Sequence, residues 1–285
     1  MRQMATLGRL KLPPMQFWRS LFRKRAVAPP PPEPARCDAL ALRHAEIAAM
    51  YAGQRVAGDF YQFLRVGPSR LLFLLLDAAG LRPDTREILT AVQKKFLTLV
   101  PILFAGENFN EATAIVELCH EINRAILRSG LRSCPSFIGC YNEELGTLGY
   151  ANAGHTPGLL RDHTGIKPLG ATGLPLGLFP HATQSASACH LAPGSALVAA
   201  SRGIVETNRL EMDSRVAEFG LDGVKQSLED AIILNARDLC LDMLQAAREF
   251  SPGAPTRNDL TALALVRNAA HDAAWKHSQG HVLRT

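Results

Sequence analysis

Six consecutive apolar residues end abruptly in an acid, and this run constrains the fold more than any other stretch. Residues 70–80 read RLLFLLLDAAG, with the apolar run at 71–76 and Asp77 directly after it. The run is much shorter than the roughly 20 residues that a membrane-spanning helix needs. Its length and uniform apolarity instead predict a strand buried on both faces. Such a strand would carry the carboxylate of Asp77 to the edge of a sheet.

A second acid, Asp59, lies in the sequence GDFY just upstream. Residues 54–64 and 70–76 are predicted to be two strands joined by the turn VGPS, because Gly67 and Pro68 favour a turn there. An aspartate after a strand can simply cap the turn that follows. Since two paired strands each offer an acid here, we instead expect a site that holds a metal ion or moves a proton.

The rest of the chain alternates predicted strands with predicted helices. Residues 38–51 fit either a helix or an entering strand, because their Ala-rich sequence leaves the periodicity unresolved. Helices are expected at 85–100, where Pro101 breaks the pattern, at 110–130 with Asn110 as the N-cap, and within 222–250. Further strands are expected at 137–141, 147–152, 156–162, 195–201 and within 256–268. This order predicts an α+β fold, with antiparallel sheet covered by helices.

The composition is typical of one large domain with tails. The chain has 285 residues, of which 47% are hydrophobic and 20% charged, enough to bury a sizeable core. It contains neither a membrane-spanning segment nor the apolar core of a signal peptide, which predicts a cytoplasmic protein. The six cysteines are scattered without any CxxC pair. That spacing favours reduced thiols over a disulfide framework or a zinc site.

The positive charge is concentrated at the start of the chain. Residues 1–36 carry eight Lys or Arg residues against the single acid Glu33, and they end in the proline-rich stretch APPPPEPA. Residues 15–25 alternate bulky apolar and basic side chains, so they fit either a weak helical contact with an anionic membrane surface or a solvated arm. We therefore expect a disordered arm and linker at 1–36, a folded domain at 37–268 and a C-terminal tail at 269–285. No nucleic-acid partner is expected.

Five motifs occur in an order and spacing that resemble the PPM-type protein serine/threonine phosphatases of the SpoIIE/RsbU branch. The resemblance spans about residues 45–267 and rests on GDFY at 58–61, DAAG at 77–80, YANAGH at 150–155, GLPLG at 173–177 and NDLT at 258–261. It implies a β-sandwich of two antiparallel sheets flanked by helices. It also implies two Mg²⁺ or Mn²⁺ ions that polarise a phosphate and activate a bridging water. Substrates in this branch are phosphoserines on anti-sigma-factor antagonists.

The metal ligands that the resemblance implies are only partly present. Asp59 and Asp77 match two of the family's acids, and the Asp77 position is the one that bridges both ions. The expected TDG acid is Arg202 in the sequence SRG, and the acid pair near the C-terminus reads Asn258-Asp259. An amide oxygen is a weaker ligand for these hard cations than a carboxylate. An arginine about 4 Å from a divalent ion is repelled by roughly 8 kcal/mol at an effective dielectric of about 20. The resemblance therefore implies a weak or partial metal site made of Asp59, Asp77, Asn258 and Asp259.

These substitutions leave three functional hypotheses. In the first, the chain is a pseudophosphatase that binds a protein partner without a metal cofactor. Arg202 would then bind a phosphoserine or a carboxylate, or it would pair with Asp59 or Asp77 and close the pocket. In the second, the chain is a working phosphatase that holds one Mn²⁺ or Mg²⁺ ion through Asp59, Asp77 and Asp259, and acts on a phosphoserine-bearing anti-sigma-factor antagonist. In the third, it is a membrane-surface regulator whose basic arm carries the function.

Overall fold

A computed structural model describes most of the folded part of the chain. The described residues are 36–53, 58–78, 82–106, 109–130, 133–211, 215–232, 235–252 and 258–269. All of them belong to the second of two units into which the chain divides, residues 32–285. The predicted arm at 1–36 and tail at 269–285 lie almost entirely outside the described residues, as does the beginning of the strand predicted at 54–64.

The described part contains strands and helices that alternate along the chain. The strands are β1 (Arg36–Ala41), β2 (Ala45–Ala52), β3 (Gly58–Val66), β4 (Arg70–Ala78), β5 (Ser136–Asn142), β6 (Thr147–Ala153), β7 (Gly158–Asp162), β8 (Gly165–Leu169), β9 (Ser187–His190), β10 (Ala196–Ala200), β11 (Asn208–Leu210), β12 (Val216–Glu218) and β13 (Leu260–Arg267). The helices are α2 (Arg82–Leu103), α3 (Glu111–Arg128), α4 (Arg202–Val205), α5 (Gly220–Asp230) and α6 (Ala236–Phe250).

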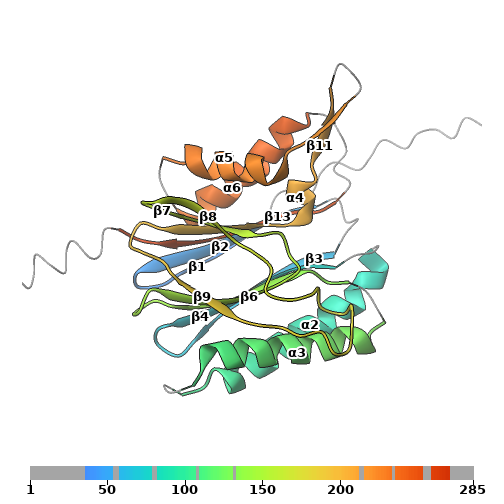
Figure 1. Ribbon diagram of the computed structural model, residues 1–285, viewed down its shortest axis with the longest axis vertical. Helices are drawn as coiled ribbons and strands as arrows, with labels where there is room; N and C mark the ends of the chain where they lie inside the picture. Colours follow the sequence, from blue (N-terminus) through green and yellow to red (C-terminus); the bar gives the residue numbers. More distant parts are fainter. Residues whose placement is uncertain are drawn as a thin grey trace, which may run out of the picture. The chain divides into compact units, whose positions relative to one another are not determined.

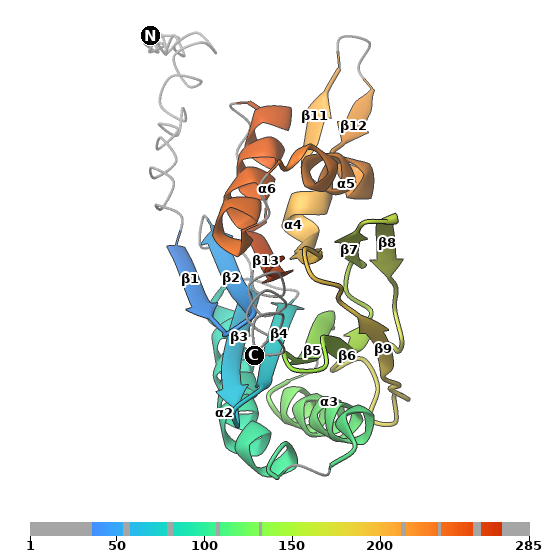
Figure 2. The ribbon, with the colours of Figure 1, turned by 90° about the vertical axis from the view of Figure 1, so that its left-hand side faces the viewer.

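Two antiparallel sheets lie face to face with helices on their outer sides (Figure 1). The first sheet has the strand order β1-β2-β13-β10-β7-β8, and the second has the order β3-β4-β5-β6-β9. Helices α5 and α6 cover the first sheet, and α2 and α3 cover the second. Figure 2 shows the two-stranded hairpin β11–β12 projecting beside α5 and α6. The predicted α+β class and the sandwich of two antiparallel sheets flanked by helices are confirmed.

Strand β4 is buried on both faces, as the apolar run predicts. Leu72, Leu74 and Leu76 pack towards α2 and α3, in one hydrophobic cluster. Leu71, Phe73 and Leu75 point the other way, into the cluster between the two sheets. All six side chains are 0% exposed. Since full burial of such a side chain contributes roughly 1.5–3 kcal/mol, β4 is a central source of stability for both layers.

The ambiguous segment 38–51 forms strands rather than a helix. Strands β1 and β2 pair in antiparallel register, with Arg36 opposite Tyr51 and Ala41 opposite Glu46. Alternate residues of β2 face opposite sides, because Ile47 and Ala49 enter the cluster between the sheets while Ala48 and Met50 face α6. A period of two residues with both faces apolar explains why the sequence did not distinguish strand from helix.

The prediction that Pro101 breaks its helix is wrong. Helix α2 runs through Pro101 and ends at Leu103. Proline removes one backbone hydrogen bond and crowds the preceding turn, but here it stands in the last turn of the helix. Phe96 and Val100 just before it are fully buried against the second sheet, and this packing holds the end of the helix in place.

Other boundaries follow local chemistry. Asn110 caps α3 as predicted, because its side-chain oxygen accepts a hydrogen bond from the backbone N–H of Thr113 at 3.0 Å. Four short features were not predicted from the sequence: β8, β9, the β11–β12 hairpin and α4. None of the helices in the described part of the chain has the length and apolarity of a membrane span. None of the six cysteines, all of which lie in the described part, forms a disulfide bond.

Candidate functional site

Asp59 and Asp77 stand directly opposite each other on paired strands. The register of β3 and β4 pairs Asp59 with Asp77, next to the pair Gly58 and Ala78. Asp77 is only 4% exposed, and its backbone N–H donates to the carbonyl of Pro135 at 2.9 Å. The two predicted strands therefore pair as expected and bring their acids together at one end of the second sheet.

Asp59 is held by a hydroxyl from the other sheet. The Thr261 hydroxyl on β13 donates to Asp59 Oδ2 at 2.6 Å. Thr261 is fully buried, and its backbone N–H donates to the hydroxyl of Ser201 at 3.1 Å. The site is therefore built across the two sheets. Sequence reasoning missed Thr261 and Ser201 as site residues, although Thr261 ends the NDLT motif and Ser201 precedes Arg202.

The environment of Asp59 favours its protonated form. Burial raises the pKa of Asp59 well above its ordinary value, and the neighbouring Asp77 carboxylate raises it further. Hydrogen bonds from Thr261 and Ser201 lower the pKa of Asp59 again, and the charge of Asp259 adds to the increase. Burial and the charge of Asp77 outweigh the hydroxyl donors.

This shift predicts a pH-dependent stability that the substitution Asp59→Asn removes. Because the folded state binds the Asp59 proton more tightly than the unfolded chain, the stabilisation is complete below the unfolded pKa and is lost as the pH rises towards the folded pKa. Asparagine keeps an acceptor for Thr261 but carries no charge. We expect Asp59→Asn to be more stable than wild type at pH 8 by on the order of 1 kcal/mol, and the difference to shrink towards pH 4.

Urea unfolding at several pH values measures this difference. Glu144→Gln is the control, since Glu144 is an exposed acid in the β5–β6 turn. It should leave the pH profile unchanged. If Asp59→Asn is less stable than wild type at pH 8, the raised pKa of Asp59 is contradicted.

Arg202 begins helix α4 and forms an ion pair with Asp77. Arg202 Nε lies 3.2 Å from Asp77 Oδ2, and a terminal guanidinium nitrogen lies 3.5 Å from Asp77 Oδ1. Glu206, one turn later, is 3.8 Å from the same Nε. The Arg202 side chain is 42% exposed while that of Asp77 is 6% exposed, so the cation spans from the buried acid to the surface. Among the contacts predicted for Arg202, the ion pair with Asp77 is the one present in the structure.

The Asn258-Asp259 pair packs against Gly203 of α4. Asp259 is 1% exposed, and a Cβ built at Gly53 would come within 2.4 Å of its Oδ1. A larger residue at position 53 would therefore displace this carboxylate. A Cβ at Gly203 would lie 3.1 Å from the Cβ of Asn258 and 1.9 Å from the carbonyl oxygen of Asp259. Both residues predicted from the motif are thus brought next to the helix that carries Arg202.

His155 is a further buried polar residue at this site. Its backbone N–H donates to Asn152 Oδ1 at 2.8 Å, and its Nδ1 lies 3.0 Å from the carbonyl oxygen of Thr156. Burial lowers the pKa of His155, and the charges of Asp77 and Arg202 act on it in opposite directions. The neutral imidazole therefore lines the site beside the ion pair. The YANAGH motif contains His155, but sequence reasoning used the motif only for the family resemblance.

The described residues contain no cluster of three or more His, Cys, Asp or Glu side chains with the geometry of a metal site. Asp59, Asp77 and Asp259 are the acids that the structure gathers, and the Arg202 guanidinium faces both carboxylate oxygens of Asp77. The structure therefore places a cation against the acid that the family resemblance assigns to a bridging metal ligand.

Comparisons with known proteins agree with this architecture. The family model of Stage II sporulation protein E (SpoIIE) matches residues 86–268. A search of curated proteins finds no match. Among solved structures, the RsbU and RsbW domains of Rv1364c from Mycobacterium tuberculosis are similar with a TM-score of 0.63 and 21% identity, over 79% of this chain and 60% of that one.

Two further structures show the same fold. The PP2C phosphatase domain of SpoIIE from Bacillus subtilis, solved with a fragment of its regulatory domain, has a TM-score of 0.64 and 14% identity, over 81% of this chain and 71% of that one. RsbX in complex with magnesium has a TM-score of 0.58 and 13% identity, over 81% of this chain and 98% of that one. The sandwich is thus that of the PP2C-type phosphatases. Since the SpoIIE model matches well over half of its residues, the chain belongs to the SpoIIE family.

Proposed function

We propose that this SpoIIE-family protein is a pseudophosphatase, which regulates a signalling pathway by binding a protein partner at the Asp59–Asp77 site. The observation that carries the proposal is the ion pair between Arg202 and Asp77, at 3.2 Å. In the family resemblance, Arg202 stands where a metal-binding acid is expected and Asp77 is the acid that bridges two ions. An arginine paired with that acid repels a metal cation and occupies the carboxylate that would bind it.

The residues fit a pair of divalent ions poorly. Such ions, when bound, polarise the phosphate and lower the pKa of the attacking water. Mg²⁺ and Mn²⁺ require carboxylate, carbonyl or water oxygens around them. Here the Arg202 cation is paired with Asp77, and Asn258 offers only an amide. We therefore propose no metal-dependent step at this site.

Arg202 is well placed to receive an anion from a partner. Its guanidinium can donate to a phosphate or a carboxylate through two parallel hydrogen bonds, and the side chain is 42% exposed. Glu206, at 3.8 Å from Arg202 Nε, can keep the guanidinium partnered when it turns away from Asp77. We propose a phosphoserine-bearing protein, such as an anti-sigma-factor antagonist, as the partner, in the cytoplasm. The similar structure that joins RsbU and RsbW domains supports a protein partner.

An active Mn²⁺- or Mg²⁺-dependent serine/threonine phosphatase is the second candidate. The facing pair Asp59 and Asp77 favours it, because these acids and Asp259 are close enough to affect one another's charge. One ion could be held by the three acids if Arg202 turned outward to Glu206. RsbX, one of the similar structures, is in complex with magnesium.

Phosphopeptide binding tests the first candidate. Fluorescence anisotropy of a labelled phosphoserine peptide, with the serine peptide as reference, should show a preference for the phosphorylated form. Arg202→Gln should reduce that preference by about tenfold, because one charge-assisted pair contributes roughly 1.5–3 kcal/mol. Arg209→Gln is the matched control, since Arg209 is a half-exposed arginine on the β11–β12 hairpin. Equal binding of both peptides, or an unchanged preference in Arg202→Gln, would contradict the proposal.

A further inference from the structure

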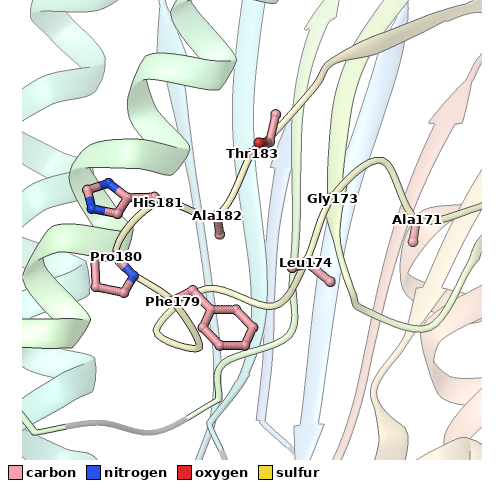
Figure 3. Close-up of a pocket in the computed structure, with 8 residues that line it drawn as sticks. All are labelled: Ala171, Gly173, Leu174, Phe179, Pro180, His181, Ala182 and Thr183. Carbon is pink, nitrogen blue, oxygen red and sulfur yellow. The ribbon is translucent and has the colours of Figure 1, made fainter.

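A pocket lies in the loop that joins β8 to β9, where the GLPLG sequence occurs. Its volume is about 570 Å³, and its walls come from two stretches of the same loop, 171–174 and 179–183 (Figure 3). Figure 3 shows the side chains of Leu174 and Phe179 beside each other at the pocket. Leu174 is 47% exposed and Phe179 is 52% exposed. A concave, mainly apolar surface of this size is typical of a binding site.

Buried amide side chains hold this loop in shape. Asn123 of α3 accepts from the backbone N–H of Gly177 at 2.6 Å and donates to the carbonyl of Phe179 at 3.0 Å. Gln184 donates to the carbonyl of Leu174 at 2.7 Å. Asn123 is 2% exposed and Gln184 is 5% exposed. Because the backbone is fixed at these points, Leu174 and Phe179 stay exposed instead of collapsing into the core, and the pocket is preorganised for a ligand.

The same loop contacts the second sheet near the end that carries Asp77. Gly173 bridges Ala153 at the end of β6, and Leu176 bridges Cys134 before β5. The Asp77 carboxylate is near enough to add to the effect of burial, which raises the pKa of Cys134 to about 12. The loop thus contacts the end of β6 and the residue that leads into β5, the strand that pairs with β4.

A short path leads from the pocket to Arg202. The path starts at Ala153, which contacts the loop and lies two residues before His155. The hydroxyl of the next residue, Thr156, donates to the carbonyl of Ala200. Arg202 is two residues after Ala200. With about 3.3 Å per strand residue and about 4.8 Å between strands, this path keeps the pocket within roughly 30 Å of Arg202. About nine residues of extended peptide cover that span.

We propose that this pocket binds an apolar side chain, of the size of Leu, Met or Phe, from the same polypeptide whose phosphoserine contacts Arg202. This inference rests on the proposed function and adds a second anchor to it. A protein segment is the occupant that fits best, because it alone joins an anion for Arg202 to an apolar group within the available span. Arg202 would select the phosphoserine, and the pocket would select which phosphoserine protein is bound.

A peptide library tests the two anchors separately. The library carries a central phosphoserine with random residues at nine positions on either side, and a second library carries serine instead. Sequencing of the peptides retained by the wild-type protein should show an enrichment of Leu, Met or Phe at one fixed offset. Phe179→Ser and Leu174→Ser should each lower the affinity for the selected peptide by about tenfold, while the preference for phosphoserine over serine stays.

Leu145→Ser is the matched control. Leu145 is 63% exposed in the β5–β6 turn, at the opposite end of β5 from Asp77, so its substitution should change nothing. Phosphoserine preference without apolar selection overturns the inference and leaves the proposed function standing. Apolar selection without phosphoserine preference overturns the proposed function and the joint occupant with it. An equal loss of affinity in Leu145→Ser would indicate nonspecific binding to exposed apolar residues, which also overturns the inference.

Discussion

Replacing Arg202 and Asn258 together by aspartate is expected to tighten Mn²⁺ binding by at least about 100-fold. The double variant removes the cation that pairs with Asp77 at 3.2 Å and adds two carboxylates next to Asp77 and Asp259. A 100-fold change corresponds to about 2.7 kcal/mol, which is well below the repulsion that an arginine exerts on a nearby divalent ion.

Each single change should do much less. Asn258→Asp leaves the Arg202 cation in place, and Arg202→Asp still lacks one carboxylate. Residues that share one site are expected to act non-additively. Calorimetric titration of the four proteins with Mn²⁺ measures the effect. If the double variant folds normally yet binds Mn²⁺ no better than wild type, our placement of the vacated metal positions is wrong.

Gly203→Ala is expected to destabilise the protein by about 3 kcal/mol. A Cβ at Gly203 would lie 1.9 Å from the backbone carbonyl oxygen of Asp259, a contact that no side-chain rotation can relieve. Helix α4 or the start of β13 would have to shift, and both carry site residues. For a domain of this size the change corresponds to a decrease in Tm of roughly 6–12 °C. Arg202 should lose its geometry with Asp77 as well.

Gly170→Ala is the control for this effect. A Cβ at Gly170 meets no atom within 4 Å, so the variant should stay within about 0.5 kcal/mol of wild type. Thermal unfolding followed by circular dichroism compares the three proteins. A Tm for Gly203→Ala equal to that of wild type would contradict the close approach of α4 to Asp259.

The sequence predicted best those parts of the fold that local chemistry decides. The apolar run at 71–76 required a strand with two covered faces, and Asn110 is a strong helix cap, so β4 and the start of α3 were correct. The prediction of a helix break at Pro101 was wrong because the packing of α2 on the second sheet outweighed the helix-breaking preference of proline. Strands β8 and β9 were not predicted because they are only five and four residues long and contain few buried side chains.

The acids of the site could be predicted, but not the groups that hold them. Asp59 and Asp77 follow from two strands joined by a short turn, whose register places them opposite each other. The contact between Asp59 and Thr261 joins residues 202 positions apart and depends on how the two sheets stack. The pairing of Arg202 with Asp77 was one of several roles that the sequence allowed. The sequence does not show that α4 begins at Arg202, next to Asp77, so it could not distinguish among these roles.

Metal-dependent turnover by the wild-type protein decides whether Arg202, paired with Asp77, has replaced metal chemistry with partner binding. Release of phosphate from a phosphoserine peptide should be measured with Mn²⁺ present, alongside the variant Asp77→Asn. We predict that wild type and variant both stay at background. Robust Mn²⁺-dependent turnover by wild type that disappears in Asp77→Asn would contradict the account and establish an active phosphatase.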